Sequence, residues 1–117
     1  MPLASECLFC RIVAREEPAD VVHATDRIMA FRDRHPRAPT HILLIPKDHV
    51  ESVGELTDKH GAVLAELFTA AAHLAKAEGI DRSGYRVVTN TGPDAGQSVF
   101  HLHLHLLAGR GLSWPPG

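Results

Sequence analysis

The segment His101-Leu102-His103-Leu104-His105-Leu106 alternates strictly between histidine and leucine. Successive side chains of a β-strand point to opposite faces, so the alternation places the imidazoles on one face and the leucines on the other. The leucine face suits a protein core. Buried imidazoles without partners would each cost about 1–3 kcal/mol, so we expect the histidine face to line a cleft. The pattern therefore predicts a final strand over residues 99–107 with a functional site on one face.

Three interpretations of the histidine face are open. It can be an exposed polar face, a three-histidine metal centre or a site of covalent chemistry, because H-x-H is a frequent ligand spacing and neutral imidazole is a good nucleophile. The preceding residues 90–98 read Asn-Thr-Gly-Pro-Asp-Ala-Gly-Gln-Ser. Glycines and polar side chains of this kind suit an anion. An anion-binding loop beside a histidine-lined strand favours phosphoryl or nucleotidyl transfer over simple metal binding.

The rest of the chain predicts short strands and one long helix. Apolar residues recur at helical period over residues 58–78, and Gly79 follows as a helix-ending glycine. A short helix is expected within residues 6–15, and strands at residues 20–25, 27–32, 41–46, 85–91 and 99–107. This order indicates an α+β fold, an antiparallel sheet of about five strands with one long and one short helix packed on it. We expect a single domain over residues 1–117.

The composition limits which binding partners and which cellular compartment we expect for the protein. A net charge of −2 provides no attraction for nucleic acid or anionic lipid, so we expect phosphate binding at a local site and no nucleic-acid partner. No apolar run is long enough to span a membrane, and the first residues lack the pattern of a signal peptide. We therefore expect a cytoplasmic protein without a membrane partner. In a reducing compartment, the C-x-x-C spacing of Cys7 and Cys10 favours a metal or redox role over a disulfide.

Three segments resemble one known family. Residues 97–107, Gln-Ser-Val-Phe-His-Leu-His-Leu-His-Leu-Leu, resemble the H-φ-H-φ-H-φ-φ signature of the histidine-triad (HIT) superfamily, in which φ is apolar. Residues 39–47, Pro-Thr-His-Ile-Leu-Leu-Ile-Pro-Lys, are similar to the strand of that family that carries a further histidine. The ending Trp-Pro-Pro-Gly, residues 114–117, is similar to that of the Hint branch, the histidine-triad nucleotide-binding proteins. The resemblance spans nearly the whole chain and implies a HIT-like fold.

The resemblance implies a role for each matching residue. His103 would attack the α-phosphorus of a nucleotide derivative and form a nucleotidyl-histidine intermediate, which water then hydrolyses. His105 would contact the phosphate oxygens, His41 would help to orient the imidazoles, and Ser98 would lie close to the leaving amine. The implied nucleotide-binding residues are Asn90 and Gly96 for phosphate, Asp33 for the ribose, and Phe9, Ile12 and Phe31 for the purine. Taken alone, the apolar members of this set would be assigned to the core.

The resemblance also implies a structural zinc site, because some triad proteins that begin with C-x-x-C bind zinc through two cysteines and two histidines. Here the ligands would be Cys7, Cys10, His49 and His101, a closed Cys₂His₂ set. The alternative is a pair of free cysteines without metal. The chemistry assigned to His103 requires no cofactor.

The activity implied is that of a homodimeric purine nucleoside phosphoramidase acting on AMP–amine substrates. A dinucleoside polyphosphate hydrolase is an alternative within the superfamily. From outside this class of enzyme, the alternatives are a nucleotide-binding regulatory protein with slow hydrolysis and a metal-dependent hydrolase that uses the histidines as ligands.

Overall fold

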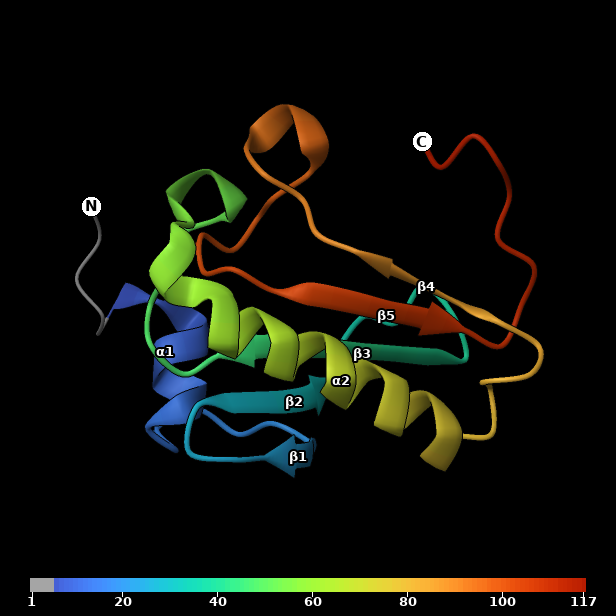
Figure 1. The fold of residues 1–117 in the computed structure, drawn as a ribbon, viewed down its shortest axis with the longest axis horizontal. Coiled ribbons are helices and arrows are strands. Elements are labelled where there is room, and N and C mark those ends of the chain that lie inside the picture. The colour runs from blue at the N-terminus through green and yellow to red at the C-terminus, as the bar shows by residue number, and fades with distance from the viewer. Residues whose placement is uncertain (1–5) are drawn as a thin grey trace.

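The computed structural model describes residues 6–117. One antiparallel sheet has the strand order β1-β2-β3-β5-β4, and a short helix, α1, and a long helix, α2, pack on it (Figure 1). The elements are α1 (Leu8–Val13), β1 (Val21–Ala24), β2 (Ile28–Arg32), β3 (Thr40–Pro46), α2 (Gly61–Ala77), β4 (Tyr85–Val88) and β5 (Leu104–Ala108). The predicted α+β fold with an antiparallel sheet of five strands is confirmed.

The two helices cover opposite faces of the sheet. Along β2, Ile28 and Ala30 pack in the cluster that contains the apolar face of α2. Met29 and Phe31, which alternate with them, pack in a second cluster with residues of α1. Strand β3 is buried along its whole length because it contributes to both clusters. The α1 face also carries the histidines, so the short helix borders the functional site.

Helix α2 is preceded by a 3₁₀ turn, Asp58–His60, so its α-helical part begins slightly later than predicted. Gly79 follows the helix with a φ of 74°, and its N–H donates to the carbonyl of Lys76 at 3.1 Å. The N–H of Ile80 donates to the carbonyl of Ala75 at 2.9 Å. These bonds form a Schellman motif and confirm the helix-ending glycine. None of the helices in residues 6–117 has the length and apolar character needed to cross a membrane.

The final strand is shorter than predicted, since β5 begins at Leu104 and leaves His101 and His103 before the strand. The register pairs Leu44 with Leu104, and β3 ends two residues later at Pro46. Proline has no N–H to continue the ladder. The N–H of Leu102 instead donates to the carbonyl of Val50. Other predicted boundaries were also too wide: β4 ends at Val88, and α1 spans only Leu8–Val13.

Candidate active site and metal centre

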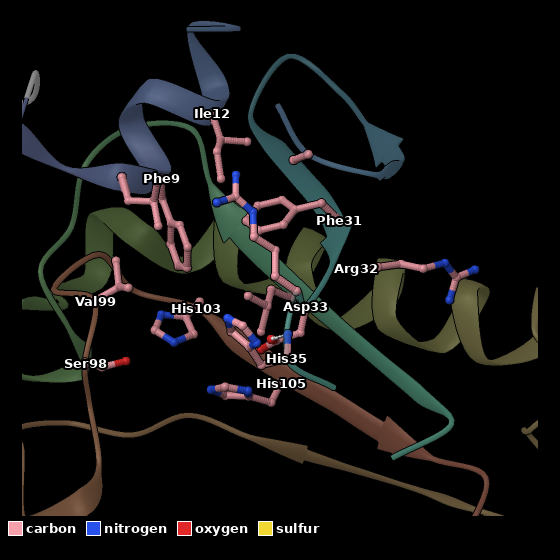
Figure 2. A pocket seen from close by; sticks show the side chains of 14 residues that line it. Phe9, Ile12, Phe31, Arg32, Asp33, His35, Ser98, Val99, His103 and His105 are labelled. Atoms are coloured by element: carbon pink, nitrogen blue, oxygen red, sulfur yellow. Dashed lines mark hydrogen bonds between the residues drawn. The ribbon is translucent and has the colours of Figure 1, made fainter. Parts of the chain in front are cut away.

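A cavity of about 260 Å³ opens on the α1 side of the sheet (Figure 2). Helix α1, the end of β2 with the loop after it, β3 and the segment from Ser98 to His105 form its walls. It is lined by Leu8, Phe9, Ile12, Ala19, Phe31, Arg32, Asp33, Arg34, His35, Leu43, Ser98, Val99, His103 and His105. Apolar side chains dominate one end and imidazoles the other, which is the usual composition of a pocket for a small molecule with a polar group.

The two ring nitrogens of His103 have different roles. Nδ1 lies 2.7 Å from the carbonyl oxygen of His101, which only accepts, so Nδ1 carries the proton and donates. In a neutral ring, Nε2 then keeps its lone pair. Burial lowers the pKa of His103, although the hydrogen bond to His101 and the Asp33 carboxylate oppose this shift. His103 is therefore a neutral imidazole near pH 7 with a free Nε2, the form that acts as a nucleophile.

A relay of hydrogen bonds sets the proton on His105. The backbone N–H of Arg37 donates to Nδ1 of His41 at 3.0 Å, so the proton of neutral His41 is on Nε2. That N–H donates to Nδ1 of His105 at 2.9 Å, which leaves the His105 proton on Nε2. Burial lowers the pKa of His105 to about 4, with help from His103 and His41. His105 therefore presents to the cavity a neutral ring with one N–H donor, at Nε2.

Asp33, His41 and His105 place three potential metal-ligand atoms within 4.8 Å of one another. Nε2 of His41 carries the relay proton and lies 3.5 Å from the Asp33 carboxylate. A metal at this nitrogen would require the proton to move to Nδ1, where it would meet the N–H of Arg37. This arrangement favours a hydrogen-bond relay over a metal site at these three residues.

Phe9 connects the apolar end of the cavity with the nucleophile. Its ring lies edge-to-face against Phe31 at 5.4 Å and against His103 at 5.1 Å. Phe9, Ile12 and Phe31 are nearly fully buried in one cluster, and each also lines the cavity. Figure 2 shows Ile12 and Phe31 at the end of the cavity away from Ser98 and His105. The same side chains thus form part of the core and the wall of the cavity.

Cys7, Cys10, His49 and His101 form a second cluster next to the cavity, with one ligand atom of each within 4.8 Å of the others. Nε2–H of His101 donates to the carbonyl of Pro46 at 2.8 Å, which leaves its Nδ1 lone pair facing the sulfurs at 3.3 and 3.5 Å. Nδ1 of His49 lies 3.4 Å from Sγ of Cys10. Tetrahedral zinc with ordinary bond lengths requires sulfur–nitrogen separations of about 3.6 Å.

The four residues therefore fit a structural zinc ion. Burial and the neighbouring Cys7 raise the pKa of the Cys10 thiol to about 11. A divalent cation would reverse this preference by stabilising the thiolates. His101 belongs to this cluster and does not line the cavity, so the three alternating histidines serve two different environments.

Comparison with known proteins agrees with this geometry. The family model of the HIT domain matches residues 14–112. The chain belongs to the HIT family. It is 44% identical over 110 residues to the purine nucleoside phosphoramidase of Escherichia coli K12, covering 94% of this chain and 92% of that protein. It is also 45% identical over 115 residues to the 14 kDa zinc-binding protein of Zea mays, covering 97% and 89%.

A solved structure extends the comparison to the HIT fold. The crystal structure of a HIT family hydrolase from Legionella pneumophila Philadelphia 1 superposes with a TM-score of 0.93 at 49% identity. The alignment covers 95% of this chain and 99% of that one. The resemblance to the HIT superfamily that the sequence motifs indicated is confirmed.

The HIT domain brings most of the predicted site residues to one cavity, but not all of them. Ser98 lines the cavity beside the imidazoles, whereas Asn90 and Gly96 are outside its lining. Their phosphate-binding roles stay predictions. The side chain of Gln97 is already engaged and is not placed to bind an anion. Its oxygen accepts from the N–H of Gly92, and its amide group donates to two backbone carbonyls. Gln97 therefore holds the loop before the histidines in place.

Sequence reasoning missed Arg34 and His35, which also line the cavity of the HIT domain. They follow Asp33 directly, and the N–H of His35 donates to the Asp33 carboxylate at 2.7 Å. Their adjacency to a predicted ribose-binding residue was the available signal. It was weak, because a loop between two strands gives no periodicity from which the direction of a side chain can be predicted.

Proposed function

We propose that this HIT domain is a purine nucleoside phosphoramidase, a hydrolase that cleaves the phosphorus–nitrogen bond of AMP–amine substrates through a nucleotidyl-histidine intermediate. The observation that carries the proposal is the protonation state of His103. Its Nδ1–H is committed to the His101 carbonyl at 2.7 Å, so the lone pair of Nε2 remains for attack on phosphorus. The similarity to the phosphoramidase of Escherichia coli, at 44% identity, supports the same reaction.

The first half-reaction forms a bond between His103 Nε2 and the α-phosphorus and breaks the bond from phosphorus to the amine nitrogen. The amine needs a proton to leave, and the exposed hydroxyl of Ser98, which lines the cavity, can relay one from solvent. The Nε2–H of His105 donates to a phosphate oxygen as negative charge develops there. In the second half-reaction, water attacks the phosphorus and gives up a proton to solvent, the bond to Nε2 breaks, and the nucleoside monophosphate is released.

The nucleoside is assigned to the other end of the cavity. Phe9, Ile12 and Phe31 provide apolar walls for the purine, and the Asp33 carboxylate accepts hydrogen bonds from the ribose hydroxyls. Asn90 and Gly96 remain candidates for phosphate contacts once a ligand is bound. The resulting substrate is a purine nucleotide with an amine on its phosphate.

We extend the proposal to assembly and cofactor. The ending Trp114-Pro-Pro-Gly117 supports membership of the Hint branch and a homodimer. Strand β4 is at the edge of the sheet, and the half-exposed ring of Tyr85 on it leaves a surface that a second copy can cover. The Cys₂His₂ cluster would hold zinc, which supplies a rigid cross-link between α1 and the histidine segment. Free thiols persist in reducing compartments, which supports the cytoplasm as the location. We also propose that residues 1–117 form a single HIT domain, which the family match over residues 14–112 supports.

The test is release of AMP from adenosine 5′-phosphoramidate by the purified protein and by His103→Ala. Turnover by the natural protein and its loss by at least 1000-fold in the variant are expected, because the covalent path needs the Nε2 lone pair. His73→Gln, an exposed change on α2, is the matched control and should keep full activity. Turnover that persists in His103→Ala would contradict the mechanism. A natural protein that binds AMP but shows no turnover would contradict the proposed enzymatic activity and favour a nucleotide-binding role.

A further inference from the structure

Arg34 lies at the apolar end of the cavity, in the loop that follows β2. Its Nη2 donates to the carbonyl of Pro18 at 2.7 Å and lies 3.6 Å from the carboxylate of Glu17. Ala19, the next residue along, lines the same cavity and packs against the cluster that contains Phe31. The guanidinium is therefore held at the end of the cavity where the walls are apolar.

The other arginine of the cavity wall is engaged elsewhere. Arg32 forms a bidentate pair with Glu78 at the end of α2, with distances of 2.9 and 3.1 Å. Figure 2 shows its side chain directed away from His103 and His105 and toward α2. For Arg34, by contrast, the bonds formed within residues 6–117 use only Nη2. Nη2 carries two N–H groups and the Pro18 carbonyl accepts one, so the second Nη2–H remains for a ligand together with Nε–H and Nη1–H.

The position of these donors matches the edge of a base and not a phosphate. Ser98, His103 and His105 lie at the opposite end, as Figure 2 shows, and they account for the phosphate. A neutral base with hydrogen-bond acceptors on its edge is the group that an arginine fork in an apolar pocket recognises.

We propose that Arg34 is a specificity-determining residue that makes the cavity favour guanine nucleotides over adenine nucleotides. The inference rests on the proposed function, which places the purine among Phe9, Ile12 and Phe31. Guanine presents two acceptors, O6 and N7, to a guanidinium, whereas adenine presents N7 beside an amino group that is itself a donor. The remaining Nη2–H, paired with Nε–H or with Nη1–H, forms a fork that can bond both edge atoms of guanine but meets a donor on adenine.

The experiment compares the binding of GMP and AMP by isothermal titration calorimetry, which needs no turnover. We expect the natural protein to bind GMP on the order of tenfold more tightly than AMP, the discrimination of one bidentate arginine contact. In Arg34→Ala the ratio should fall to within twofold of one, through weaker GMP binding. Arg82→Ala removes an exposed arginine outside the cavity and should keep the ratio of the natural protein.

A natural protein that binds both nucleotides without preference would overturn the role of Arg34. So would an Arg34→Ala variant that keeps the preference or weakens both nucleotides equally. A protein that binds neither nucleotide would overturn the proposed function itself, and the two failures are thereby distinguished. The melting temperature of each variant confirms that a changed ratio comes from a folded protein.

Discussion

Replacing His41 by leucine removes the middle of the relay that orients His105. The side chain is nearly fully buried, and leucine has a similar volume, so the main cost is the loss of two hydrogen bonds. Nδ1 of His105, which is partly buried, would lose its hydrogen-bond donor. The N–H of Arg37, which is more accessible to water, would lose its acceptor. We expect a loss of about 2–4 kcal/mol in the free energy of unfolding. For a domain of this size, that corresponds to a melting temperature lower by about 8–16 °C.

The same change should reduce catalysis more than binding. Without the N–H from His41, His105 is free to hold its proton on Nδ1, and Nε2 then offers no donor to the developing charge on phosphate. Loss of one charge-assisted hydrogen bond, about 1.5–3 kcal/mol, corresponds to a fall in kcat of about 10- to 150-fold, with KM changed little. Circular dichroism gives the melting temperature, and AMP release gives the kinetics. A folded His41→Leu variant with unchanged kcat would refute the relay as the reason for the position of His41.

Three further outcomes are expected. Elemental analysis should find about one zinc ion per chain. Cys10→Ser should lower both the zinc content and the melting temperature, because it breaks a closed ligand set. A variant with full zinc content would exclude the cluster as the site. The pKa of His105 is about 4 in the folded chain and about 6.5 when unfolded, so the unfolded state takes up the proton first and stability should fall as pH drops from about 6.5 to about 4. Urea unfolding at a series of pH values across this range measures the free energy of unfolding. A pH dependence of stability that is unchanged in His105→Gln would contradict the assignment of this effect to His105. Gly109→Ala should lower the melting temperature, since a Cβ there would come within 2.8 Å of Pro39 at a φ of 94°; an unchanged melting temperature would show that the loop relaxes freely.

Much of the fold was predictable because its signals are local. Helical periodicity located α2, and Gly79 marked its end. The apolar run ending in Pro46 located the central strand β3. The boundaries were less accurate where pairing decides them. The final strand was expected from residue 99, but the ladder stops at Leu104 because Pro46 ends the partner strand.

The candidate site was predicted in part, and the residues that were missed have a common cause. Arg34 and His35 are in a loop, where no periodicity indicates which side chains turn toward a cavity. Gln97 was interpreted with the anion-binding donors, but its amide bonds to backbone groups as far along the chain as Glu51. A partner that distant is not visible in the local sequence.

The sequence by itself determined the alternation of histidine and leucine, the periodicity of the long helix and the motifs of the HIT family, all of which depend on neighbouring residues. Only the tertiary structure decided what each histidine does. His41 meets His105 across 64 positions because β3 and β5 pair in a register that sets Leu43 opposite His105. His101 meets Cys7 across 94 positions, which takes it out of the cavity and into the metal cluster. The tautomer and pKa of an imidazole depend on such partners and on burial, and packing between distant segments determines both.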